Sequence, residues 1–210
     1  MKIRSESFPW ISVSGLLAVV SYAVWIYTGS LIVEILFALF TALAIFFVYF
    51  FRDPERTPNS EEDTDWVSPA DGVVTGIETL PDGRKKIVIF LTVFNVHVNR
   101  MPVDGTVREI DYREGQFLPA YKGELDEKNE QNRVICEDSL ERPFEVWPIA
   151  GQFARRIHCW TDVSNPFKRG DRFGMISLGS RTDLLLPKGV DPCVKPKETV
   201  RGGQTIVARG

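Results

Sequence analysis

The chain contains a serine that could act as a nucleophile, Ser180, directly after Gly179. A serine hydroxyl attacks a carbonyl once a base takes its proton. Because glycine has no Cβ, the chain can bend sharply at Gly179 and expose the carbonyl group of that residue. The dipeptide alone is equally typical of an ordinary hairpin turn, so its surroundings must decide between the two interpretations.

His97 is the best candidate for the base. It is one of two histidines, it follows the strand-like run 86–93, and an imidazole titrates near neutral pH. Asp71, in a tight Ala-Asp-Gly turn, could orient the imidazole as the acid of a catalytic triad does. Asp183 is a rival for that role. The other histidine, His158, lies in an alternating strand pattern, and we expect it to be structural.

The elements that carry these residues are predicted to be short strands separated by glycine and proline. Residues 86–93 (KIVIFLTV) are rich in β-branched and aromatic side chains and form the strongest predicted strand. Residues 112–133 contain nine charged residues and few β-formers, so we expect a long loop or a short helix there. Weaker strand patterns occur at residues 73–74, 103–107, 144–149, 154–160 and 173–177.

The C-terminal part contains a weak internal repeat. Residues 168–176 and 200–208 each begin with a basic-glycine turn and continue as an apolar strand. Such paired half-motifs resemble the barrel-sandwich fold of lipoyl and biotinyl carrier domains, so we predict a mainly β domain of this kind. A carrier domain holds a modifiable lysine in the hairpin between the halves. Here the hairpin is predicted at residues 178–181, and the nearest lysine, Lys188, lies beyond a proline, which disfavours a carrier role.

The N-terminal part is predicted to anchor the protein in a membrane. Two apolar runs, residues 10–27 and 31–51, are each close to the length of about 20 residues that a span requires. Gly29 and Ser30 separate them and favour a turn, so we expect a helical hairpin. A cleaved signal peptide fits poorly, because no small-residue cleavage site follows the first run and the second run would be unexplained. A hairpin that dips into one leaflet remains open as an alternative to a double span.

Basic residues flank both ends of this hairpin. Lys2 and Arg4 precede it, and Arg52 and Arg56 follow it. Positive charge on both outer ends predicts that both ends lie in the cytoplasm, so the β domain would face the cytoplasm from the cell membrane. The predicted organisation is an anchoring hairpin (1–51), a polar linker with prolines (52–65) and a β-rich catalytic domain (66–210).

Composition excludes several other classes of protein. With 44% hydrophobic and 25% charged residues, the chain of 210 residues can bury a core and is not globally disordered. A formal net charge of −3 argues against a nucleic-acid partner. Cys136, Cys159 and Cys193 form no Cys-x-x-Cys pair, so they predict no zinc site, and an odd, sparse set fits a reducing compartment.

An ordered set of short motifs resembles the short form of phosphatidylserine decarboxylase. Each motif alone is unspecific, but the set at these spacings, from residue 51 to the C-terminus, is highly specific. The motifs are FRDP (51–54), SPADG (68–72), VFNVHVNRMP (93–102), GQFL (115–118), NEQN (129–132), IAG (149–151), ARRI (154–157) and FGMI (173–176) leading to GSR (179–181).

The resemblance implies a decarboxylase that makes its own cofactor. Ser180 Oγ would attack the Gly179 carbonyl, and an ester would replace the peptide bond. β-Elimination would release the upstream chain, and the resulting dehydroalanine would hydrolyse to a pyruvoyl group and ammonia. The products would be a large chain (1–179) and a small chain (180–210).

The pyruvoyl group would accept the electrons that the departing CO2 leaves behind, a task that pyridoxal phosphate performs in many other decarboxylases. No binding motif for pyridoxal phosphate is evident, and no metal is expected. The implied reaction converts phosphatidylserine to phosphatidylethanolamine in phospholipid biosynthesis. The same chemistry on another serine-headed lipid, such as archaetidylserine, is the nearest alternative, and a non-catalytic, lipoyl-like binding module on the membrane is the alternative from another class.

One position departs from the longer members of the family. They often carry two histidines three residues apart, whereas this chain has His97 and Arg100, so His97 is expected to serve both maturation and decarboxylation. Arg100, Arg155 and Arg181 are expected to bind the lipid phosphate, with Arg156 as a further candidate. The membrane lipid is the expected partner, and a homo-oligomer is compatible with the sequence, which leaves the oligomeric state open.

Overall fold

The computed structural model describes residues 2–59, 62–115, 129–151, 156–177 and 180–210. The chain divides into two compact units, Met1–Glu55 and Arg56–Gly210.

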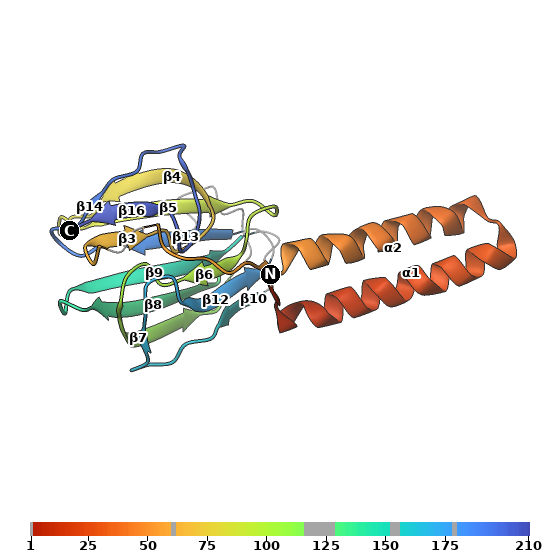
Figure 1. Ribbon diagram of the computed structural model, residues 1–210, viewed down its shortest axis with the longest axis horizontal. Coiled ribbons are helices and arrows are strands. Elements are labelled where there is room, and N and C mark those ends of the chain that lie inside the picture. Colours follow the sequence, from red (N-terminus) through yellow and green to blue (C-terminus); the bar gives the residue numbers. More distant parts are fainter. Residues whose placement is uncertain (1, 60–61, 116–128, 152–155, 178–179) are drawn as a thin grey trace. The chain divides into compact units, whose positions relative to one another are not determined.

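The first unit is a helical pair, as the hydropathy pattern predicts (Figure 1). Helix α1 ends where Gly29 adopts a left-handed conformation (φ 59°), and its N–H caps the helix by donating to the Trp25 carbonyl. Trp10 and Tyr22 of α1 contact Phe47 and Phe37 of α2, with ring centroids 5.4 and 5.3 Å apart, so the two helices pack side by side. Both are long and apolar enough to cross a membrane. The elements are β1 (Lys2–Ile3), a 3-10 turn (Ser5–Ser7), α1 (Phe8–Thr28), α2 (Leu31–Phe50) and β2 (Arg52–Asp53), with β1 paired to β2.

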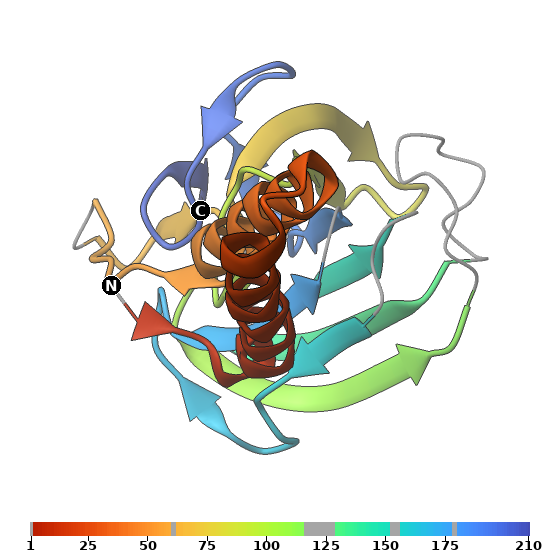
Figure 2. The same cartoon turned by 90° about the vertical axis from the view of Figure 1, so that its right-hand side faces the viewer.

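The second unit is built of β-strands, which confirms the predicted mainly β class. An eight-stranded antiparallel sheet has the order β11-β7-β8-β9-β13-β5-β4-β15, and two three-stranded sheets have the orders β10-β12-β6 and β14-β16-β3. The large sheet curls into a half-barrel, with β4 (yellow) and β7 (green) on opposite sides of it (Figure 2). The strands are β3 (Asp65–Val67), β4 (Gly72–Thr79), β5 (Lys85–Leu91), β6 (Val98–Arg100), β7 (Gly105–Arg113), β8 (Gln131–Asp138), β9 (Pro143–Ala150), β10 (Arg156–Cys159), β11 (Pro166–Phe167), β12 (Arg172–Ser177), β13 (Ser180–Leu185), β14 (Asp191–Pro192), β15 (Thr199–Val200) and β16 (Ile206–Arg209).

Two expectations from the sequence need correction. The segment 112–133, expected to be a loop or a helix, begins and ends in strands: Tyr112 and Arg113 close β7, and residues 131–133 open β8, while residues 116–128 lie outside the described residues. β13 itself was not predicted as a strand. Its sequence, SRTDLL, mixes charged and apolar residues because both of its faces are buried.

Side-chain alternation divides the large sheet into an inner and an outer face. Ile87, Ile89 and Leu91 of β5 point inward into the main hydrophobic core, together with Leu184 of β13. Lys86 of β5, directly before Ile87, lies on the outer face, where its ammonium group is 3.7 Å from the Asp183 carboxylate. This division decides which residues of β13 can reach the interior.

The β unit is an internal duplication. Read from its centre between β9 and β13, the large sheet has equivalent strands on both sides, and the two small sheets are also equivalent: β10, β12 and β6 correspond to β14, β16 and β3. The segment VSPADGVV (67–74) matches RMPVDGTV (100–107) at the corresponding turns. The half formed by residues 98–177 is inserted between the two parts of the other half, 65–91 and 180–209. Ser180 is therefore the first described residue after the inserted half.

The repeat seen in the sequence is part of this duplication. Its strands are β12 and β16, which hold equivalent places in the two small sheets. The preceding turns contain Gly170 and Gly203, both left-handed, with φ 88° and 74°. A Cβ added to Gly203 would lie 3.7 Å from the Gly170 Cα and 2.6 Å from Arg100 Cδ. The two turns thus pack together at a place where only glycine fits.

Candidate active site

Ser180 is the first residue of β13, in the middle of the large sheet. It is fully buried and pairs with Ala150 of β9 on one side and Leu91 of β5 on the other. It shares the inner face of the strand with Thr182 and Leu184, and Leu184 belongs to the core. Among the described residues, Ser180 Oγ has no hydrogen-bond partner. A buried hydroxyl without a partner is costly, so this position is expected to have a functional reason.

The small sheet β10-β12-β6 covers this end of the inner face. Ile157 of β10 and Ile176 of β12 form an apolar cluster with Ala150, the sheet neighbour of Ser180. The Asn99 side-chain amide, on β6, donates to Thr182 Oγ1 at 3.0 Å and so joins the small sheet to β13. Ser180 therefore lies between two layers, at a site closed to bulk water.

His97 lies immediately before β6 and is also fully buried. Its Nδ1 is 3.0 Å from the Asn95 carbonyl, and its own carbonyl accepts the Ile176 N–H at 3.2 Å. The hydrogen bond between Asn99 and Thr182 joins β6 to β13. Asn99 is two residues from His97, and Thr182 is two residues from Ser180. The structure thus brings the predicted base and the predicted nucleophile to the same part of the interior.

Asp71 connects three segments of the chain. Its Oδ1 accepts the Gly202 N–H at 2.8 Å, and its Oδ2 accepts the Val96 N–H at 3.4 Å, next to His97. Both carboxylate oxygens accept hydrogen bonds from the Arg56 guanidinium group, that to Oδ2 at 2.9 Å. Asp71 therefore reaches the His97 turn through the backbone of Val96.

The rival acid, Asp183, lies on the outer face of β13, opposite to Ser180. Arg181 lies on the same outer face and donates two hydrogen bonds to Asp183, from Nε to Oδ1 at 2.7 Å and from an Nη to Oδ2 at 2.6 Å. Both residues are buried. This placement favours Asp71 over Asp183 as the acid on the side of His97.

The other arginines expected at the site have different surroundings. Arg100 is buried and donates to the Gly170 carbonyl at 2.8 Å, whereas Arg156, the first residue of β10, is exposed. Arg155, like Gly179, lies outside the described residues. The assignment of these arginines to a lipid phosphate stays a prediction.

Polar residues around Ala150 belong to the site although their roles were not predicted. The Asn129 amide donates to the Ala150 carbonyl at 2.9 Å, and the Ala150 N–H donates to the Glu130 carbonyl at 2.8 Å. The Glu130 carboxylate accepts the Ile157 N–H at 3.2 Å and the Tyr112 hydroxyl at 3.0 Å. Burial and the hydrogen bond to Glu130 raise the pKa of Tyr112 above its ordinary value, so this hydroxyl stays a donor. These residues hold β9, the strand that pairs with Ser180. For Asn129 and Glu130, the signal in the sequence was the NEQN motif.

Asn99 and Asn132 add further polar groups to the interior. The Oδ1 atoms of both are buried and have no hydrogen-bond partner among the described residues. Within the same residues, no three His, Cys, Asp or Glu side chains lie close enough together to hold a metal ion. Asn99, which is bonded to Thr182 on the strand of Ser180, thus offers an uncommitted oxygen to a polar ligand.

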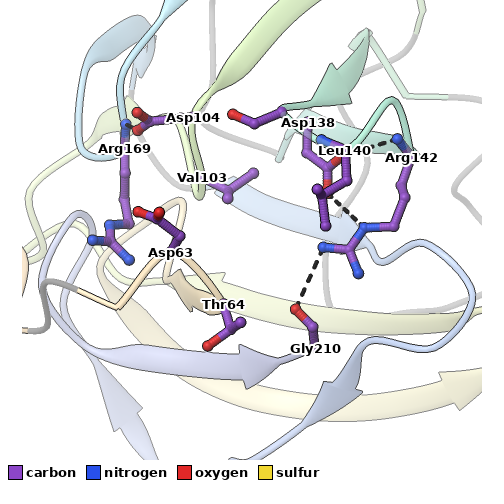
Figure 3. A pocket seen from close by; sticks show the side chains of 10 residues that line it. Asp63, Thr64, Val103, Asp104, Asp138, Leu140, Arg142, Arg169 and Gly210 are labelled. Atoms are coloured by element: carbon purple, nitrogen blue, oxygen red, sulfur yellow. Dashed lines mark hydrogen bonds and ion pairs between the residues drawn. The ribbon is translucent and has the colours of Figure 1, made fainter.

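A pocket elsewhere in the β unit does not contain these residues. Its volume is about 210 Å³, and Asp104, Arg169, Asp138 and Arg142 are among its lining side chains (Figure 3). The Arg142 guanidinium group is already bound to Asp138 at 2.7 Å. No predicted catalytic residue lines this pocket, so we do not assign the reaction to it.

The chain is similar to known decarboxylase proenzymes. The model of the phosphatidylserine decarboxylase family matches residues 43–208. A phosphatidylserine decarboxylase proenzyme of Nitratidesulfovibrio vulgaris is 46% identical over 177 residues, 81% of each chain. One of Geotalea uraniireducens is 37% identical over 212 residues, 98% of this chain and 95% of its own length. A protein of Halobacterium salinarum, named as a candidate archaetidylserine decarboxylase proenzyme, is 43% identical over 171 residues, 80% of this chain and 83% of its own length.

These matches show that the protein is a decarboxylase. The chain belongs to the phosphatidylserine decarboxylase family.

Proposed function

We propose that this protein cuts its own chain between Gly179 and Ser180 and then decarboxylates phosphatidylserine to phosphatidylethanolamine at the cell membrane. The observation that carries the proposal is the position of Ser180: a buried hydroxyl without a partner among the described residues, at the start of a central strand, directly after a glycine. The proenzyme names of the relatives agree with a chain that is made as a precursor.

Maturation would use residues of the chain and one molecule of water. Ser180 Oγ attacks the carbonyl carbon of Gly179, the Gly179–Ser180 C–N bond breaks, and an ester joins the two residues. Removal of the Ser180 Cα proton then expels the Gly179 carboxylate. The remaining dehydroalanine takes up water, loses ammonia and becomes the pyruvoyl group at the start of the small chain.

His97 is proposed as the base that takes the Ser180 proton. It is buried, and contacts with the Asn95 carbonyl and the Ile176 N–H hold it in place. Asp71 supports it by fixing the neighbouring Val96 N–H. With arginine at position 100, His97 is also the histidine of this motif that is available to work near the substrate carboxylate or to protonate the carbanion.

The surroundings of Ser180 fit a pyruvoyl group. A pyruvoyl group linked to the substrate amine supplies an electron sink for the carbanion that loss of CO2 creates. The chain contributes a closed space between two sheets, the apolar cluster of Ala150, Ile157 and Ile176, and the uncommitted Asn99 Oδ1. Exclusion of water by this cluster would strengthen the electrostatic interactions inside the site.

The membrane anchor suits a substrate that stays in the bilayer. Helices α1 and α2 are long and apolar enough to hold the protein there, and the basic residues at their outer ends support a β domain facing the cytoplasm. The relative from Halobacterium salinarum favours one alternative substrate, archaetidylserine, which carries the same serine headgroup. Vesicles that contain either lipid, assayed for release of CO2, would tell the two substrates apart.

Intact mass spectrometry of the purified protein tests the self-cleavage. We expect two chains, residues 1–179 and 180–210, and the small chain should resist Edman degradation because a pyruvoyl end has no amine. An active protein that consists of one uncut chain would refute the proposal.

A further inference from the structure

A buried cluster consists of Arg56, Asp71 and Gly202, and of these three only Asp71 has a role in the proposed mechanism. The Arg56 guanidinium group binds both oxygens of the Asp71 carboxylate and also donates to the Gly202 carbonyl at 2.7 Å. The Gly202 N–H donates to Asp71 at 2.8 Å. Both polar groups of the Gly202 backbone are thus held by the same ion pair. The two side chains are only 9% and 11% exposed, so water screens their interaction little.

Because the β unit is duplicated, the other half contains an aspartate turn equivalent to this cluster. Asp104 is the equivalent of Asp71, and its Oδ1 accepts the Arg169 N–H at 2.6 Å in the equivalent turn. A carboxylate that holds this turn is therefore part of the repeated fold. The cations differ, however. Among the described residues, the cation beside Asp104 is the ammonium group of Lys168 at 3.3 Å, whose side chain is 81% exposed.

Among the described residues, the guanidinium fork and the Val96 contact are thus found at one copy of the duplicated turn. That copy is the one next to His97. The fork fixes the orientation of the Asp71 carboxylate, because both oxygens are held in one plane. The orientation of the carboxylate in turn determines where its Oδ2 meets the Val96 N–H, at 3.4 Å.

The proposed cleavage gives the cluster a second role. Arg56 and Asp71 lie in the large chain, whereas Gly202 lies in the small chain. The equivalent cluster in the other half consists of Asp104, Lys168 and Arg169, and it lies entirely within the large chain. The cluster would thus remain as a set of hydrogen bonds across the two chains after the peptide bond between them is lost.

We propose that Arg56 is a positioning residue for maturation: through Asp71 it fixes the turn that carries His97 and holds the turn of the small chain that contains Gly202. This inference rests on the proposed function. Loss of the guanidinium group leaves the Asp71 carboxylate buried without its cation, which is costly, and allows the Val96 turn to shift. Slower cleavage of the precursor and weaker retention of the small chain both follow.

The test compares Arg56→Met with Lys168→Met, the matched change at the equivalent aspartate. Full-length protein in detergent is followed on denaturing gels for the rate of cleavage after synthesis. The cut protein is then exposed to increasing urea, and release of the small chain is followed by native mass spectrometry. We expect Arg56→Met to slow cleavage on the order of ten- to a hundredfold, as for the loss of hydrogen bonds to a charged group, and to release the small chain at lower urea. Lys168→Met should behave like the wild type.

Arg56→Gly separates positioning from a general loss of folding. Guanidinium ions at low concentration should enter the vacated space and restore part of the cleavage rate, whereas ammonium ions should not. Wild-type cleavage in Arg56→Met, or a slow Arg56→Gly that guanidinium does not accelerate, would overturn the inference. Failure of the wild-type protein itself to cleave would instead refute the proposed function.

Discussion

At the scale of single residues, the candidate nucleophile is held by strand pairing on both sides and not by a loop. Ser180 begins β13 between Ala150 and Leu91, and its inner-face neighbour Thr182 is bound to Asn99. A side chain on such a rigid element is positioned more accurately than one on a loop.

Replacement of Ser180 by alanine should abolish both cleavage and decarboxylation. The change removes the attacking oxygen, which is also the atom that leaves with the upstream chain. No other route to the cofactor remains. Intact mass spectrometry should show a single chain of full length. Ser177→Ala, at another buried serine three residues earlier, is the control and should still be cut. A cleaved Ser180→Ala protein would mean that another residue is the nucleophile.

Replacement of His97 by alanine should leave the precursor mostly uncut, because the serine would lose its base. Asp71→Asn should mature slowly, since a neutral side chain binds Arg56 less well and holds the His97 turn less firmly. Loss of an orienting acid can reduce a rate by about 10⁴-fold in a catalytic triad, and a smaller loss is expected where the acid acts through the backbone. The rate of cleavage after synthesis, followed on denaturing gels, measures both effects.

His158→Ala is the matched control for the His97 prediction. His158 lies on β10 and is only partly buried, so its loss should leave the cleavage rate unchanged. Normal cleavage of His97→Ala would place the base elsewhere, with a water molecule held by Arg100 as the next candidate.

At the scale of elements, local patterns of the sequence predicted strands, but they did not predict which distant segments come into contact. Residues 86–93 predicted β5 because β-branched and aromatic side chains dominate there. The fork from Arg56 to Asp71 joins residues 15 apart, and the bond from Gly202 joins residues 131 apart. Such contacts depend on how the strands are ordered, which a local pattern does not contain.

The same reason explains why β13 was missed and the internal repeat was found. The repeat consists of local turn motifs at Gly170 and Gly203, which a sequence shows directly. In β13, Arg181 and Asp183 look like surface residues, but they neutralise each other on a buried face. Their burial becomes clear only once the strands on both sides are known.

The outer face of the large sheet should make stability dependent on pH through Glu145. Its carboxylate on β9 accepts hydrogen bonds from the Arg133 guanidinium group and from Trp147 Nε1, the latter at 2.8 Å. Burial by itself raises the pKa of Glu145, but these two hydrogen bonds outweigh it, so the pKa lies below the ordinary value of 4.5. The ionised form therefore stabilises the fold above pH 4.5, and this contribution is lost as the pH falls through the lowered pKa.

Glu145→Gln tests this dependence because the amide cannot ionise. The variant should melt at a lower temperature than the wild type at neutral pH, by the equivalent of about 1.5–3 kcal/mol for hydrogen bonds to a charged group. The difference should shrink as the pH falls below 4.5. Glu78→Gln, at a carboxylate that is 52% exposed, should change the melting temperature little at any pH. A difference between Glu145→Gln and wild type that stays constant in acid would contradict the prediction.

At the scale of the whole molecule, the chain joins a pair of helices long and apolar enough to cross a membrane to a β unit that consists of two interleaved halves. Strand β13 lies between β9 of the inserted half and β5 of the other half. A cut before Ser180 would leave β13 bound to both through sheet pairing, so the small chain would stay in place by backbone hydrogen bonds, core packing and the Arg56 cluster. The duplication thus makes the cleavage compatible with a stable product.

Deletion of residues 1–50 should give a more soluble protein that still cleaves itself. The deletion removes α1 and α2, whose apolar surfaces require a membrane or detergent, but it keeps Arg56 and the complete β unit that holds Ser180, His97 and Asp71. Cleavage needs only these residues, whereas turnover of a lipid in vesicles should fall because the truncated enzyme must find the bilayer from solution. The two effects are measured separately, by intact mass spectrometry and by CO2 release from vesicles compared with detergent micelles. A truncated protein that is folded but uncut would show that the helical pair also supports the site.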